Sequence, residues 1–147
     1  MRVVAKNKKA YFDYFIEESI EAGIELSGTE VKSIKASQLN LRDAYISIDN
    51  LEAYVLSMHV AKYEKGNIHN LDPYRKRKLL MHKREIVKLY EAVKKQGLTL
   101  VPLQVYVNDR GRIKLTVGLV RGKKLYDKRE SLKLKDDKRS IERDRQY

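Results

Sequence analysis

The sequence contains no cysteine and no tryptophan, and only two prolines occur among its 147 residues. Because cysteine is absent, disulfide bonds and thiolate-bound zinc are excluded, and we expect a protein of a reducing compartment, the cytoplasm. No apolar run approaches the ~20 residues that a membrane-spanning helix needs. The first residues, MRVVAKNKKAY, are basic and lack the apolar stretch of a secretory signal peptide. We therefore expect neither a secreted disulfide scaffold nor a membrane-spanning protein.

Positive charge is in excess along the whole chain. The sequence has 32 Lys and Arg against 20 Asp and Glu, a formal net charge of +12. Residues 121–147 carry 11 of the basic and 6 of the acidic groups, so most of the excess lies in residues 1–120. Such a distribution favours a polyanionic partner over a stray basic tag. By charge alone, both nucleic acid and an anionic membrane surface fit.

Alternation of apolar and polar residues predicts several strands. The clearest strands are residues 98–107 and residues 112–120, which the turn NDRG joins, and it is in the second of them that apolar and polar residues alternate. Residues 14–26 predict a long strand with a bulge or bend at Gly23, and residues 44–60 predict a hairpin that turns at Asp49-Asn50. About five mainly antiparallel strands indicate a small closed or nearly closed barrel. An oligonucleotide-binding (OB) type of barrel is the favoured form, and an open α+β sheet is the alternative.

Two helices complete the predicted body. A short helix covers residues 30–37 after a start at Thr29. A longer helix covers residues 75–96, where apolar residues recur every seven positions, and ends at Gly97. Residues 2–9 predict a flexible basic arm, and residues 61–74 predict a loop.

The expected domains are an RNA-binding barrel with flanking helices over residues 1–120 and a basic tail over residues 121–147. Charged pairs in the tail would each stabilise a helix by only a few tenths of a kcal/mol. Ordering the backbone costs ~1–2 kcal/mol per residue. We therefore expect the free tail to be disordered and to become helical only beside a polyanionic partner, where its cations release counterions.

The sequence offers little that resembles an active site. His59, His69 and His82 are far apart and show no metal-ligand spacing. Glu30-Val31-Lys32 has the acid-x-Lys spacing that one nuclease class uses to hold a divalent metal, but it falls in a predicted helix rather than on a strand. We therefore expect no catalytic residue, no metal and no cofactor, with a nuclease centred on Glu30 and Lys32 as the enzyme alternative.

Signals for RNA binding are stronger. Basic residues crowd the segments 75–78 (RKRK) and 82–84 (HKR), with few acids nearby, and Tyr11 and Tyr14 follow the basic N-terminal arm. Cations position a phosphate backbone, and aromatic rings stack on splayed bases, as looped RNA requires. A solvated helix face is the simpler interpretation of the cluster. A constitutive ribosomal or other structural RNA-binding protein is an alternative function.

Nine segments, taken together, carry a family resemblance. In chain order they are NKKA (7–10), DYFIEE (13–18), EAGI (21–24), GTEVKS (28–33), DP (72–73), RKLL (77–80), HKRE (82–85), GLTLVP (97–102) and GKKLYDKR (122–129). They resemble the signature blocks of SmpB, the family of bacterial tmRNA (SsrA)-binding proteins.

The resemblance implies an OB-type barrel and a non-enzymatic role in trans-translation. Members of the family bind the tRNA-like domain of tmRNA and bring it to ribosomes stalled on messages without a stop codon. Their tail enters the decoding region and message channel of the small subunit, in place of a codon–anticodon pair, so the resemblance implies that residues 121–147 become helical on the ribosome. Elongation factor Tu is a companion through aminoacylated tmRNA, and no membrane is involved.

The matched blocks also imply site residues. Those expected at the tmRNA surface are Asn7, Lys8, Tyr14, Glu21, Arg77, Lys78, Leu80, His82 and Lys83, to which the basic cluster adds Arg75 and Arg84. Those expected in the decoding region are Gly122, Lys123, Lys124, Tyr126, Asp127, Lys128 and Arg129. Glu21 would repel phosphate, so it either accepts hydrogen bonds from base amino groups, orients a lysine, or simply faces solvent. Leu80 fits the core equally well.

Overall fold

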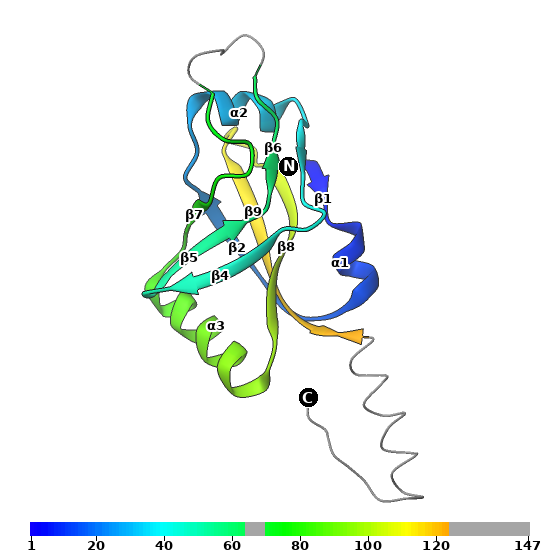
Figure 1. The fold of residues 1–147 in the computed structure, drawn as a ribbon, viewed down its shortest axis with the longest axis vertical. Coiled ribbons are helices and arrows are strands. Elements are labelled where there is room, and N and C mark those ends of the chain that lie inside the picture. Colours follow the sequence, from blue (N-terminus) through cyan, green and yellow to red (C-terminus); the bar gives the residue numbers. More distant parts are fainter. Residues whose placement is uncertain (64–69, 124–147) are drawn as a thin grey trace, which may run out of the picture.

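The computed structural model describes residues 1–63 and 70–123, and these form a mainly antiparallel β structure with three helices (Figure 1). The elements in chain order are β1 (Arg2–Lys6), α1 (Lys8–Asp13), β2 (Tyr14–Ile24), α2 (Gly28–Lys35), β3 (Leu39–Asn40), β4 (Tyr45–Asp49), β5 (Glu52–Leu56), β6 (His59–Val60), β7 (Arg77–Leu80), α3 (Lys83–Gln96), β8 (Thr99–Val107) and β9 (Ile113–Gly122). The predicted residues that lie outside the described ranges are His69, Lys124, Tyr126, Asp127, Lys128 and Arg129.

Seven strands form one sheet in the order β1-β8-β9-β2-β7-β5-β4, and β3 pairs with β6 in a second, two-stranded sheet. The large sheet curls until β4 lies close to β8. Among the described residues these two strands share no backbone ladder, so the barrel stays open at this seam. The predicted mainly β, OB-like class is confirmed, with more strands than the sequence indicated.

The strands follow the hydrophobic pattern that predicted them. On β9, Ile113, Leu115, Val117 and Leu119 are buried and alternate with half-buried polar residues up to Thr116. The ladder between β2 and β9 shifts register between Ile16 and Glu18, so the bulge falls there and not at Gly23. β9 also continues to Gly122, beyond the expected domain boundary at residue 120.

The N-terminal segment is not a flexible arm, and that prediction was wrong. β1 pairs with β8, and its Val4 is buried, while Ala10 of α1 is only 2% exposed. Asn7 joins the two elements, because its Oδ1 accepts from the backbone N–H of Ala10 at 3.1 Å and its Nδ2 donates to the carbonyl of Pro102 at 2.8 Å. The lysines that suggested an arm occupy the exposed positions between these buried residues.

The predicted helix over residues 75–96 was wrong in its first part. Residues Arg77–Leu80 form β7, which pairs with both β2 and β5, and the helix α3 begins only at Lys83. Its end was predicted correctly, since Gly97 adopts the left-handed conformation with φ 66°. α2 begins two residues before the predicted helix over residues 30–37, with Ser27 as N-cap and a capping box to Glu30.

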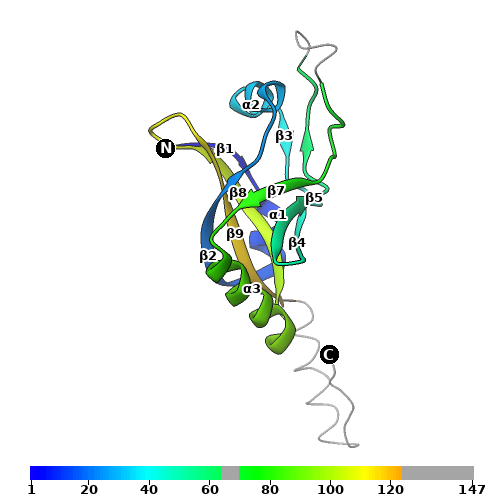
Figure 2. The ribbon, with the colours of Figure 1, turned by 90° about the vertical axis from the view of Figure 1, so that its left-hand side faces the viewer.

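The helices cover opposite ends of the barrel, α2 at one end and α3 at the other (Figure 2). The last described residues of β9 lie at the same end as α1 and α3 (Figure 1). In the part of the chain that the structure describes, no helix is both long and apolar enough to cross a membrane.

Candidate nucleic-acid interface

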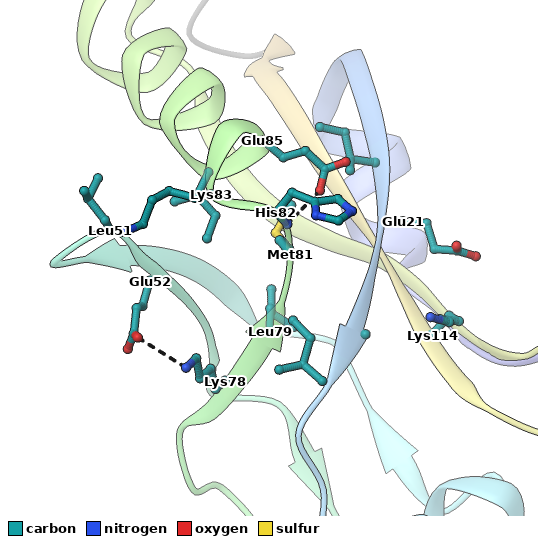
Figure 3. Close-up of a pocket in the computed structure, with 14 residues that line it drawn as sticks. Glu21, Leu51, Glu52, Lys78, Leu79, Met81, His82, Lys83, Glu85 and Lys114 are labelled. Atoms are coloured by element: carbon teal, nitrogen blue, oxygen red, sulfur yellow. Dashed lines mark hydrogen bonds and ion pairs between the residues drawn. The ribbon is translucent and has the colours of Figure 1, made fainter.

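A cleft of about 710 Å³ opens between β2, β7, the β4–β5 turn and the start of α3 (Figure 3). Five residues expected at the RNA surface line it, namely Glu21, Lys78, Leu80, His82 and Lys83. They come from three separate sequence segments, and pairing of β2 with β7 brings them together. We name this cavity the β2–β7 cleft.

Strand pairing exposes an apolar side chain in the cleft. Gly23 lies opposite Leu80 in the ladder, and a Cβ on Gly23 would lie 3.4 Å from the Cβ of Leu80. Leu80 therefore lies over a position without a side chain, and it is 53% exposed. The alternative that Leu80 belongs to the core is therefore wrong, because its apolar side chain is exposed and lines the cleft.

The first turn of α3 forms another wall of the cleft. His82 is its N-cap residue, and the backbone N–H of His82 donates to Oε1 of Glu85 at 3.1 Å (Figure 3). This bond fixes where Lys83 leaves the helix start. Arg84 is exposed but does not line the cleft.

A third wall comes from β5, where Glu52 holds two neighbours. The hydroxyl of Tyr54 donates to Oε1 of Glu52 at 2.8 Å, and Nζ of Lys78 donates to Oε2 at 3.2 Å. These hydrogen bonds hold the pKa of the Glu52 carboxyl below its ordinary value. Nζ of Lys76 lies 4.4 Å from the centroid of the Tyr54 ring, a cation–π contact. Glu52 is therefore an ionised group that hydrogen-bonds Lys78, one of the residues expected to contact RNA.

Glu30 of α2 is buried in an ionic network with two arginines. Its carboxylate accepts from Nε of Arg75 at 2.9 Å, from NH2 of Arg75 at 2.7 Å and from Nε of Arg77 at 2.8 Å. Burial opposes ionisation of Glu30, but the hydrogen bonds from Arg75 and Ser27 and the charge of Arg77 outweigh it, so its pKa is lowered. The network ties α2 to the segment before β7.

This network corrects the expectation for Arg77 and bears on the nuclease alternative at Glu30 and Lys32. Arg77 is 0% exposed and also donates to the carbonyls of Met58 and Pro73, so its side chain shapes the fold and does not face a ligand. Glu30 is engaged by both guanidinium groups, and the described residues contain no cluster of three metal-ligating side chains. The Glu30-x-Lys32 triplet lies on a helix, so a nuclease centre there has no geometric support.

The remaining expected residues lie near α1, away from the cleft. A smaller groove of about 220 Å³ is lined by residues that include Asn7, Lys9, Tyr14, Arg42 and Tyr45. Asn7 itself is only 4% exposed and caps α1, so it acts from inside the fold. Lys8 is exposed on α1 but does not line this groove.

Tyr14 also marks where the tail begins. It pairs with Gly122 at the end of β9, and Nζ of Lys123 lies 5.3 Å from the centroid of the Phe15 ring. The expected tmRNA residue Tyr14 and the first expected decoding-region residues, Gly122 and Lys123, are thus neighbours. The set predicted from sequence divides into the β2–β7 cleft and this second region.

Sequence reasoning missed Glu52, Tyr54 and Lys114, which line or border the cleft. Glu52 and Tyr54 alternate on the polar face of the predicted hairpin, and Lys114 alternates on β9, so a polar face was visible in each pattern. The polar face of the hairpin lines the cleft because β5 pairs with β7, and the sequence pattern predicts a helix where β7 lies.

Comparison with known proteins places these features in a family. Residues 4–147 match the family described as SmpB protein. The SsrA-binding protein of Acetivibrio thermocellus is 54% identical over 97% of this chain and 92% of its own, and that of Bacillus cereus is 54% identical over 97% and 91%. A solved chain from "tmRNA-SmpB: a journey to the center of the bacterial ribosome" is 46% identical, with a TM-score of 0.71 over 93% of this chain and 96% of that chain. The resemblance seen in the nine segments is confirmed, and this chain belongs to the SmpB protein family.

Proposed function

We propose that this protein binds the tRNA-like domain of tmRNA and delivers it, without catalysis, to stalled ribosomes in trans-translation. Relatives more than half identical to it are SsrA-binding proteins, and a similar chain comes from a tmRNA-SmpB ribosome structure. The observation that carries the proposal is the convergence of Glu21, Lys78, Leu80, His82 and Lys83 on one cleft.

The chemistry of the cleft suits a folded RNA with exposed bases. Lys78 and Lys83 attract phosphates, and Leu80 offers an apolar surface to an unstacked base. Glu21 is exposed on β2 beside Lys114 of β9, where it can accept hydrogen bonds from base amino groups (Figure 3). Lys8, Arg75 and Arg84 are exposed or partly exposed cations outside the lining of the cleft, where they can attract further phosphates. Asn7 and Arg77 support the surface from within.

The tail has a separate role in this proposal. Residues 122–129 are assigned to the decoding region and the message channel, in place of a codon–anticodon pair. Elongation factor Tu is a partner through aminoacylated tmRNA, and the protein acts in the cytoplasm.

Replacement of Lys83 tests the cleft. In Lys83→Ala we expect the affinity for a tRNA-like-domain transcript to fall severalfold, and the slope of log affinity against log salt to become less steep by ~0.7–0.9, the loss of one phosphate contact. The matched control is Lys95→Ala, an exposed lysine at the far end of α3. Filter binding at four salt concentrations gives both quantities. Equal effects in the two variants would contradict the assignment of the cleft.

A further inference from the structure

The β2–β7 cleft is nearly balanced in charge, although the protein carries a net +12. Its lining contains three carboxylates and three ammonium groups, those of Glu21, Glu52, Glu85, Lys78, Lys83 and Lys114. A groove that gripped phosphates by charge alone would lack the carboxylates, because each one repels a phosphate. Attraction of phosphate therefore does not explain why the lining contains three carboxylates.

Among the three acids, Glu52 is the one whose geometry bears most directly on a lysine of the cleft. Tyr54 and Lys78 are directly opposite each other in the β5–β7 ladder, so their side chains share a face with Glu52 two residues away. Both carboxylate oxygens are in use, Oε1 by the Tyr54 hydroxyl and Oε2 by Nζ of Lys78. A phosphate that approached Lys78 would have to displace Glu52 or accept its repulsion.

The effect of such a pair depends on the ligand. A regular RNA duplex presents mainly phosphates and 2′-hydroxyls to a protein, whereas looped RNA also presents base edges with amino donors. A carboxylate accepts hydrogen bonds from those amino groups, as it does from the N4 amino group of cytosine. Repulsion by Glu52 would thus weaken the binding of a regular RNA duplex more than the binding of looped RNA. A repulsive group creates specificity in this way.

We infer that Glu52 is a specificity-determining residue of the cleft, which holds Lys78 and so disfavours duplex RNA relative to looped, tRNA-shaped RNA. This inference rests on the proposed function. Tyr54 is a positioning residue, since its hydroxyl orients the Glu52 carboxylate. The quantity that Glu52 controls is the ratio of the affinities for the two RNAs.

The test compares Glu52→Gln with wild type on two probes, a transcript of the tRNA-like domain and a loop-free RNA duplex of similar length. In the variant we expect the affinity for the duplex to rise about threefold to fivefold, the scale of one exposed ion pair. We expect its salt slope to steepen by ~0.7–0.9, because Lys78 is freed for a phosphate. The affinity for the tRNA-like domain should stay level or fall. The control is Glu91→Gln, an exposed acid of α3 outside the cleft.

The outcomes separate the inference from the function on which it rests. The measured ratio is the affinity for the tRNA-like domain divided by the affinity for the duplex. A lower ratio in Glu52→Gln, together with the wild-type ratio in Glu91→Gln, supports the role of Glu52. An unchanged ratio, or the same loss in both variants, overturns it while the wild-type preference stands. If the wild type itself shows no preference for the tRNA-like domain, the proposed function fails first. Should Glu52→Gln not fold by circular dichroism, Tyr54→Phe decides, with a smaller loss of the ratio expected and an unchanged ratio overturning the inference.

Discussion

At the scale of single residues, the structure depends on buried ions that hold one another. Glu30 is 5% exposed and receives hydrogen bonds from two arginines, one of which, Arg77, has no exposure at all. Removing one partner of such a network leaves an uncompensated charge in the interior, which costs more than the network itself contributes. Glu30 thereby fixes the start of β7 and, through it, Lys78 and Leu80.

Replacement of Glu30 by Gln should destabilise the protein by about 3 kcal/mol at neutral pH, because Arg77 stays buried without a counter-charge. The pKa of Glu30 is lower in the folded state than its ordinary 4.5. Its contribution to stability is therefore fully present above about pH 4.5 and is lost as pH falls through the folded pKa. Urea unfolding should show that the difference in free energy of unfolding between wild type and Glu30→Gln is smaller at pH 3 than at pH 7. An advantage of equal size at both pH values would contradict this account.

At the scale of elements, the β4–β5 turn combines strain with exposure. Asn50 and Leu51 have positive φ angles of 56° and 62°, as a two-residue hairpin turn requires. Asn adopts this conformation readily, but Leu does so at a cost of about 1 kcal/mol or more. Leu51 is 43% exposed and lines the cleft, so the strained residue presents an apolar side chain there.

Leu51→Gly should therefore raise the free energy of unfolding by about 0.5–1 kcal/mol, since glycine relieves the strained turn. The same change should lower the affinity for the tRNA-like domain, because an apolar contact is lost. Leu51→Ala is the matched control, which removes the contact and keeps the strain, so it should lower affinity without a gain in stability. Thermal unfolding and filter binding measure the two effects. Loss of stability in Leu51→Gly would show that the turn is not strained.

Elements with local signals were predictable, and elements that depend on distant partners were not. β9 alternates clearly at its start, β8 is a largely apolar run, and Gly97 ends α3 as its type suggests. β7 was hidden because Arg77 resembles a surface residue until its partner Glu30, 47 positions away in sequence, is known. The family blocks located half of the cleft, but Glu52 entered it only through the pairing of β5 with β7.

At the scale of the whole molecule, the body and the tail are proposed to do different things. The body contains the β2–β7 cleft, and residues 124–147 follow the last described residue, Lys123. A cut at residue 120 would remove Arg121 and Gly122, which pair with Phe15 and Tyr14. A clean separation of the two functions therefore requires a cut after Lys123.

A chain ending at Lys123 should bind the tRNA-like domain within about twofold of the full chain, because the residues of the cleft are all present. It should fail to support tagging on a message without a stop codon in a reconstituted translation system. The full-length protein in the same system is the control. Equal loss of binding and tagging would contradict the division of labour.

β2 connects the two regions as one strand, Tyr14–Ile24, with a single register shift between Ile16 and Glu18. Its first residue, Tyr14, pairs with Gly122 where the tail departs, and Gly23 near its other end pairs with Leu80 in the cleft. At ~3.4 Å per residue, the nine steps from Tyr14 to Gly23 span about 30 Å. β2 therefore sets a fixed offset between the two sites, so that whatever the cleft grips is held a constant distance from the point where the tail leaves. A flexible tether would give a wide range of distances, whereas a strand paired in a sheet gives one.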